Sequence, residues 1–200
     1  FFLYVPYNAP HYPMHAPKEY MERFPNLPWD RQIMAAMLSA VDDSIGEILR
    51  EVKQLGLAET TCSFFTSDNG PSRESRNWLD GNLDPYYGGI SGGLKGHKFS
   101  LYEGGIREPM IVHWPGHHKQ GYVCDVPVVS TDFYPTILEM VGLEAMPEQH
   151  PDGLSITSLV QGGKSIERDG IYWHFPHYSN HGMQSPGGAI RVDDWKLLEY

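Results

Sequence analysis

The stretch T-C-S-F-F-T-S-D-N-G at Thr61–Gly70 decides the fold class of this chain. Thr61–Thr66 is a short apolar run, which is typical of a strand buried on both faces of a parallel sheet. Asp68, Asn69 and Gly70 follow it at once, and all three residue types favour turns. The stretch therefore predicts a buried strand that ends in a polar loop.

A strand and a long helix precede this stretch. Phe1–Val5 is another continuous apolar run, and the prolines of Pro6–Pro17 force a loop after it. From Asp30, a candidate N-cap, to about Leu55, apolar residues recur at three- and four-residue steps and predict an amphipathic helix that Gly56 ends. Strand, helix and strand form a βαβ unit, so we expect an α/β fold with a mostly parallel sheet flanked by helices.

The chain changes character after Pro147. Before it, Pro109–Trp114 predicts a further strand, and a second helix is expected from Thr131 or Asp132 to Gly142. After it, turns are dense and short strands are expected at Gly170–His174, Ala189–Val192 and Trp195–Glu199, with a hairpin at Asp193-Asp194. We therefore assign residues 1–147 to an α/β body and residues 148–200 to the start of a small antiparallel subdomain.

The composition of the chain argues against some classes of binding partner. The formal net charge of −10 argues against nucleic-acid binding, which usually needs basic patches. No apolar stretch approaches the roughly 20 residues of a membrane helix. Cys62 and Cys124 lack metal-site spacing, and Cys62 lies in an apolar strand, where we expect a buried small hydrophobe rather than a reactive thiol.

Three polar clusters carry candidate chemistry. Asp68 and Asn69 lie where ligands bind in open α/β sheets, and their oxygens suit Ca²⁺ or Mg²⁺, although the tripeptide alone favours a plain D-N-G turn. His11 lies between prolines that pre-position its ring for proton donation; the alternative is a loop histidine bonded to a carbonyl. Lys95 and Lys98 lie among glycines that let backbone approach an anion; the alternative is solvated lysines.

Other polar residues have structural interpretations. We expect Arg107 to pair with Glu103 or Glu108. His174 and His177 lie among aromatic residues, where packing explains them better than a substrate rim does.

Taken together, the clusters resemble the type I sulfatases of the alkaline phosphatase superfamily, in order and over essentially the whole chain. The resemblance rests on F-F-L-Y-V-P-Y-N-A-P-H-Y-P, on F-F-T-S-D-N-G and on L-K-G-H-K-F-S-L-Y-E-G-G-I-R-E-P-M-I-V-H-W-P-G, followed by T-D-F-Y-P-T-I-L-E-M-V-G, D-G-L-S and A-I-R-V-D-D-W-K-L-L. It implies an alkaline-phosphatase-like α/β fold and hydrolysis of sulfate esters.

The resemblance also implies roles for single residues. His11 corresponds to the histidine that contacts the sulfate and its leaving-group oxygen, and Lys98 to the lysine that neutralises the sulfate. Asp68 and Asn69 correspond to two ligands of the divalent cation, usually Ca²⁺. Lys95 stands where the family often has arginine.

The chain departs from the family pattern in three places. Pro71 replaces the second glycine of D-N-G-G, and Gly96-His97 replaces the more usual Gly-Gly before the lysine. The family's formylglycine nucleophile, made from Cys or Ser in a C/S-x-P/A-x-R motif, has no counterpart among these residues. We therefore expect the nucleophile upstream, and the chain to be the C-terminal part of a catalytic domain that is inactive alone.

The substrate class is left open between several interpretations. Trp78, Tyr86, Tyr87, Trp173 and Tyr178 would suit stacking on a sugar ring, which favours a sulfated carbohydrate over an aryl sulfate, although they suit a core equally. The alternatives are a phosphodiesterase or phosphonate hydrolase of the same superfamily, and a non-catalytic relative that binds sulfated glycans. Family resemblance is compatible with a periplasmic or secreted protein.

Overall fold

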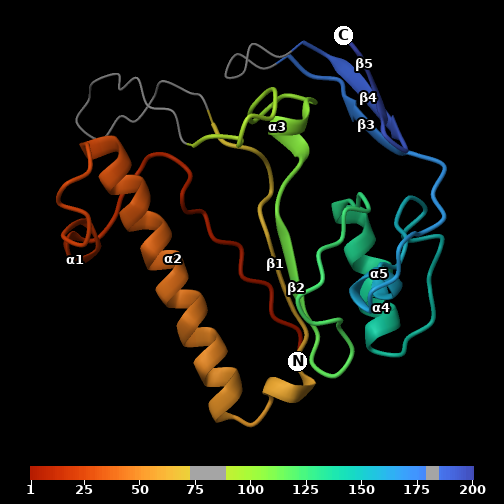
Figure 1. Ribbon diagram of the computed structural model, residues 1–200, viewed down its shortest axis with the longest axis horizontal. Helices are drawn as coiled ribbons and strands as arrows, with labels where there is room; N and C mark the ends of the chain where they lie inside the picture. Colours follow the sequence, from red (N-terminus) through yellow and green to blue (C-terminus); the bar gives the residue numbers. More distant parts are fainter. Residues whose placement is uncertain (73–88, 179–184) are drawn as a thin grey trace. The chain divides into compact units, whose positions relative to one another are not determined.

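The computed structural model describes residues 1–72, 89–178 and 185–200. The chain divides into two compact units. The first unit comprises Phe1–Ala58, Ser67–Pro109 and His177–Pro186, and the second comprises Glu59–Thr66, Met110–Pro176 and Gly187–Tyr200. Each unit is described by itself below, and Figure 1 gives the element labels.

The long helix of the first unit is α2, Trp29–Gln54, which confirms the predicted amphipathic helix. Pro28 rather than Asp30 occupies the N-cap position, and Asp30 lies in the first turn, where an acidic group favours the helix dipole. The helix ends as predicted, because Gly56 adopts φ +71°, a left-handed conformation that glycine reaches without steric cost.

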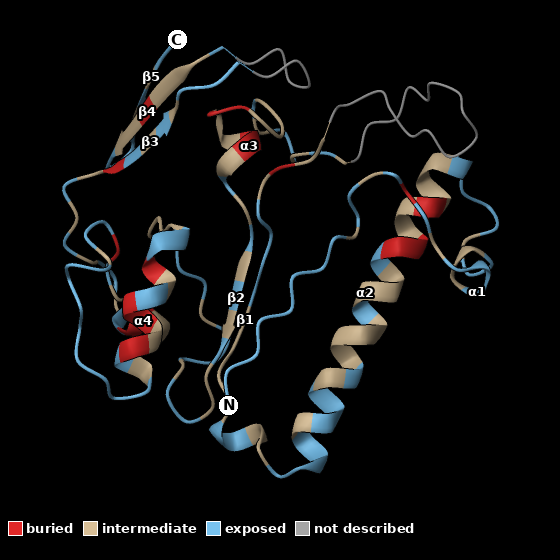
Figure 2. Cartoon of the chain, turned by 180° about the vertical axis from the view of Figure 1, so that it is seen from behind, coloured by how far each residue is buried: buried red, intermediate tan, exposed pale blue. Residues whose placement is uncertain are grey.

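The core of the first unit fixes the loop that carries His11. Met14 is fully buried against Ile33 and Met37 of α2, and the short helix α1, Lys18–Met21, lies beside them. Figure 2 shows this burial in the N-terminal half of α2. Because Ala9 and Tyr12 also pack on this cluster, the backbone on both sides of His11 is held against the helix.

The predicted strand at Phe1–Val5 is wrong. No strand is assigned to residues 1–8, and the side chains of Phe1–Val5 are exposed. A strand needs a hydrogen-bonded neighbour, and none of the strand pairs among the described residues includes this segment. The apolar run indicates extended backbone, but the run alone supplies no partner.

The second unit begins with η1, Ala58–Thr60, whose first residue belongs to the first unit, and contains β1, Ser63–Thr66, and β2, Met110–His113, near the predicted positions. The prediction that the first of these strands is buried on both faces is wrong, because Phe65 and Thr66 are exposed. The two strands pair antiparallel with Phe64 opposite Val112, so this pair differs from the expected parallel neighbours. Phe64 meets Phe133 of α4, Phe133–Met140, edge to face. The turn η3, Ser130–Asp132, leads into α4, and Gly142 follows its end with φ +74°, as predicted.

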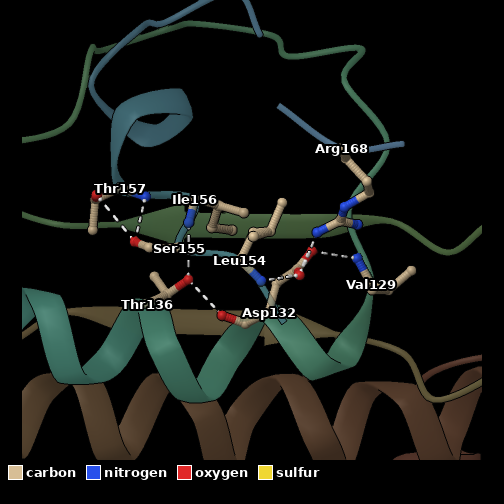
Figure 3. Close-up of polar contacts among 8 residues, drawn as sticks. All are labelled: Val129, Asp132, Thr136, Leu154, Ser155, Ile156, Thr157 and Arg168. Atoms are coloured by element: carbon tan, nitrogen blue, oxygen red, sulfur yellow. Dashed lines mark hydrogen bonds and ion pairs between the residues drawn. The ribbon is translucent and has the colours of Figure 1, made fainter. Parts of the chain in front are cut away.

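A buried polar cluster, the Asp132 cluster, ties α4 to the loop before α5, Thr157–Val160 (Figure 3). The Asp132 carboxylate accepts the backbone N–H of Val129 and of Leu154, each at 2.9 Å, and pairs with Arg168 at 2.5 Å. Thr136 donates to the Asp132 carbonyl and accepts the N–H of Ile156. One side chain thereby accepts from two loop N–H groups and from Nη2 of an almost buried guanidinium, whose Nε and Nη1 have no hydrogen-bond partner in the described part of the chain.

The expected antiparallel sheet is present at the C-terminal end. Strands β3, Ile171–Phe175, β4, Gly187–Val192, and β5, Trp195–Glu199, pair in that order. Val192 faces Trp195 across the turn Asp193-Asp194, and Asp193 has φ +49°, so the predicted hairpin is confirmed. Among the described residues, no helix has the length and apolar character needed to cross a bilayer.

Candidate functional site

The first predicted cluster follows the end of β1 directly. Asp68 is exposed and Asn69 is half-buried. Ser67 donates from its hydroxyl to the Asn69 carbonyl at 3.2 Å, which closes a small turn. The predicted strand-end position of both candidate ligands is therefore confirmed, and their carboxylate and amide groups stand on a short, hydrogen-bonded loop.

Glycines attach this loop to α3, Glu103–Ile106. The Gly70 N–H donates to the Gly105 carbonyl at 3.0 Å. A Cβ on Gly70 would overlap the Gly104 carbonyl oxygen, and a Cβ on Gly105 would overlap the Ser100 carbonyl oxygen. Only residues without a side chain allow these three backbone segments to approach so closely.

The loop that carries Lys95 and Lys98, called the lysine loop below, is hydrogen-bonded to both of these segments. Lys98 donates its backbone N–H to the Pro71 carbonyl at 3.0 Å, and Gly104 donates to the Lys95 carbonyl at 2.7 Å. The loop that carries Asp68 and Asn69 is therefore hydrogen-bonded to the residue that carries the candidate ammonium group.

His11 and Lys98, which are 87 positions apart, meet in this structure. The Lys98 ammonium nitrogen Nζ lies 2.9 Å from His11 Nε2. His11 Nδ1 lies 2.6 Å from the Tyr12 carbonyl oxygen, and the two rings stack at 4.7 Å. A carbonyl only accepts and an ammonium only donates, so Nδ1 carries the hydrogen and Nε2 presents its lone pair to Lys98.

The candidate cation ligands form an incomplete set. Within residues 1–72, 89–178 and 185–200, no group of three or more His, Cys, Asp and Glu side chains is placed to hold a metal ion. Burial raises the pKa of the half-buried Glu108 carboxyl, and the charge of Asp68 raises it further. The Asp68 carboxylate and the Asn69 amide oxygen are donor types that a hard cation takes, although two donors are fewer than a complete site needs.

The remaining polar candidates have structural partners. The Lys95 ammonium lies over the Tyr102 ring at 4.0 Å from the centroid, so Lys95 is not placed with Lys98 on His11. Arg107 pairs with Glu103 at 3.8 Å, as expected. Cys62 is half-buried with its sulfur 3.7 Å from that of Met140, and burial raises its thiol pKa to about 11, which supports an inert thiol.

Three further residues contribute contacts at this site that were not predicted from the sequence. Glu108 interacts electrostatically with Asp68, His97 bonds the carbonyl of Lys98, and Phe99 adopts φ +73°. The only sequence signal was the replacement of a usual glycine by His97. Trp78, Tyr86 and Tyr87 lie outside the described residues, so their proposed stacking role stays a prediction.

Comparisons with known proteins show the family of this chain. The family model named Sulfatase matches residues 1–143, and the model named N-sulphoglucosamine sulphohydrolase, C-terminal, matches residues 96–200. The chain is 32% identical to arylsulfatase J of Mus musculus over 98% of its own length, and 34% identical to N-acetylgalactosamine-6-sulfatase of Rattus norvegicus over 86%. It covers 33% and 30% of these relatives, so it spans about a third of their length.

Solved structures show the fold. The structure of Ps i-CgsB in complex with k-i-k-neocarrahexaose superposes with a TM-score of 0.80 at 32% identity, over 97% of this chain and 40% of that one. The structure of BT4656 in complex with D-glucosamine-2-N,6-O-disulfate gives 0.65 at 25% identity, over 88% of this chain and 35% of that one. The phosphonate monoester hydrolase SpPMH gives 0.60 at 23% identity, which is a likeness of fold alone. The chain has the alkaline-phosphatase-like α/β fold of these proteins.

Proposed function

Because the chain belongs to the sulfatase family, we propose that the protein it is part of hydrolyses sulfate esters. One observation carries the proposal: the Lys98 ammonium lies 2.9 Å from His11 Nε2. A cation beside an imidazole can bind an anionic ester and assist departure of its alcohol.

The two side chains have distinct roles in this proposal. Lys98 binds a sulfate oxygen as a point charge and offsets the charge that develops there. His11 lies at the leaving-group oxygen. Its Nε2 lone pair faces the Lys98 ammonium in the free site, so Nε2 can take a proton from Lys98 and pass it to the departing oxygen, which leaves Lys98 neutral once the ester bond has broken.

Asp68 and Asn69 would hold a divalent cation, Ca²⁺ or Mg²⁺, together with ligands from outside the described residues. Such an ion, when bound, stabilises negative charge on the sulfate oxygens. The family resemblance implies a formylglycine upstream of this chain, which would supply the nucleophile. We accordingly assign residues 1–147 to the catalytic domain and residues 148–200 to the start of a small subdomain.

The substrate class that we favour is a sulfated carbohydrate. The support comes from similar proteins, since one is an N-acetylgalactosamine-6-sulfatase and another was solved with a glucosamine disulfate. A secreted or periplasmic location fits this proposal.

Sulfate release tests the proposal. The full-length protein should release sulfate from sulfated saccharides, and Lys98→Ala or His11→Ala should lower kcat/KM roughly 100-fold or more. Lys95→Ala is the matched control, because its ammonium lies on Tyr102, and it should change kcat/KM little.

Two results would contradict sulfate ester hydrolysis by this site. The first is hydrolysis of phosphate diesters or phosphonate monoesters in preference to sulfate esters. The second is saccharide binding with no turnover by a protein whose upstream sequence lacks the formylglycine motif, which would indicate a non-catalytic glycan-binding relative.

A further inference from the structure

His97 makes a specific contact with the backbone of the neighbouring lysine. Its Nδ1 lies 2.7 Å from the Lys98 carbonyl oxygen, and because a carbonyl only accepts, the imidazole Nδ1–H donates. His11 uses the same arrangement with the Tyr12 carbonyl. The ring of His97 is half-buried, so water competes less for this bond than it would at an exposed position.

The backbone of Lys98 is consequently held on both sides. Its N–H donates to the Pro71 carbonyl at 3.0 Å, and its carbonyl accepts from His97 at 2.7 Å. The first bond ties the residue to the loop of Asp68 and Asn69. The second fixes the peptide plane that joins Lys98 to Phe99.

That peptide plane precedes a strained residue. Phe99 has φ +73°, a conformation that costs a residue with a side chain roughly 1–2 kcal/mol. Such a conformation persists only where surrounding contacts enforce it. The N–H of Ser100 donates to the His97 carbonyl at 2.9 Å, so His97 holds the turn through its backbone as well as through its ring.

We propose that His97 is a positioning residue for Lys98, acting through the bond from its Nδ1–H to the Lys98 carbonyl. The Lys98 side chain is long, so a small rotation of this peptide would move Nζ away from His11 Nε2, which it meets at 2.9 Å. The inference deepens the proposed function and rests on it for the link to catalysis, although the positioning itself is a structural claim.

Two substitutions in the full-length protein both remove the imidazole ring of His97, but only one of them keeps a donor for the Lys98 carbonyl. In His97→Asn the side-chain amide nitrogen stands near the place of Nδ1 and can donate to the same carbonyl. In His97→Gln the amide nitrogen stands near the place of Nε2 and cannot. We expect His97→Asn to keep kcat/KM within about 2-fold and His97→Gln to lose about 3- to 10-fold, chiefly in kcat, as the loss of one hydrogen bond predicts.

The ¹⁵N resonances of the His11 imidazole give a readout that does not need turnover. They are measured on protein with ¹⁵N-labelled histidine and identified with His11→Gln. His97→Gln should shift the Nε2 resonance, because Lys98 moves away from it, and His97→Asn should not. Melting temperatures of both variants show whether either has unfolded.

The outcomes are distinguishable. The proposal is overturned if His97→Gln matches the wild type in kcat/KM and in the His11 resonance. It is also overturned if His97→Asn, folded, loses about 3-fold or more in kcat/KM, and this result decides even if His97→Gln does not fold. Absence of sulfatase activity in the wild type would refute the proposed function, whereas the His11 resonance would still test the positioning by His97.

Discussion

At the residue scale, the candidate site depends on backbone carbonyls that orient imidazole rings. His11 and His97 each donate from Nδ1 to the carbonyl of the following residue. For His11 this contact turns the lone pair of Nε2 toward Lys98. Two short local bonds therefore determine the arrangement of a pair whose members are 87 positions apart.

The thiol of Cys62 allows a direct test of burial at this scale. Its pKa is raised to about 11 because burial disfavours the thiolate. At pH 8 only about one thiol in a thousand would be ionised, and the thiolate is the reactive form. We expect Cys62 to react with a disulfide reagent at least 10-fold more slowly than the exposed Cys124, and its rate to rise with pH up to about 11. Cys124→Ser isolates Cys62, and equal rates for the two cysteines would show that Cys62 is accessible.

The sequence predicts the chemical groups of the site better than their partners. Proline on both sides of His11 and glycine around Lys98 are local signals, and the two side chains meet in the structure. The contribution of Glu108 depends on its approach to Asp68, which only the folded chain creates. The bond from His97 is local, but its importance depends on what Lys98 contacts.

At the element scale, three backbone segments approach through glycines: the loop of Asp68 and Asn69, the lysine loop, and α3. The glycine content of these segments was visible in the sequence, but their mutual contacts were not. At Phe1–Val5 the sequence pattern was misleading instead. The apolar run predicted a strand, but the segment has no hydrogen-bonded strand partner among the described residues.

A pair of alanine substitutions tests this close approach. In Gly70→Ala the new Cβ would overlap the Gly104 carbonyl oxygen, so we expect a lower melting temperature and a loss of sulfatase activity. Gly46→Ala, inside α2, meets only the flexible Arg50 side chain at 3.4 Å and should stabilise the protein by about 0.5–1 kcal/mol. Wild-type stability and activity in Gly70→Ala would contradict the packing.

The Asp132 cluster supports a second test at the element scale. Thr136→Val keeps the shape of the side chain but removes the hydroxyl that accepts the buried N–H of Ile156 at 3.0 Å. An unpaired buried donor should lower the free energy of unfolding by about 1–3 kcal/mol, measured by denaturant titration. Thr131→Val, at an exposed position of η3, is the matched control and should change stability little. A loss no larger than that of the control would show that the hydroxyl is dispensable.

At the scale of the whole molecule, the chain spans about a third of the length of its curated relatives. Its similarity to the solved structure of Ps i-CgsB extends over 97% of its own residues, with a TM-score of 0.80. The fold class was predictable from the family resemblance, whose motifs follow in order along the chain. The βαβ unit expected from the apolar runs was not, because Phe1–Val5 forms no strand and β1 pairs antiparallel with β2. The completeness of the cation site was not, because a ligand set is a property of all segments that meet there.

Measurements of Ca²⁺ binding test whether residues 1–200 supply only some of the ligands of the proposed cation site. Asp68 and Asn69 are two ligands, whereas Ca²⁺ takes about six to eight oxygens, so residues 1–200 alone should bind Ca²⁺ weakly. In the full-length protein, Ca²⁺ at 100 times its Kd should add about 2.7 kcal/mol of stability and raise the melting temperature. Asp68→Asn should remove most of this shift, and Asp152→Asn, at an exposed position, should not. Tight stoichiometric binding by residues 1–200 in calorimetry would show that this chain holds the whole site, and would contradict the expectation that ligands from outside it complete the site.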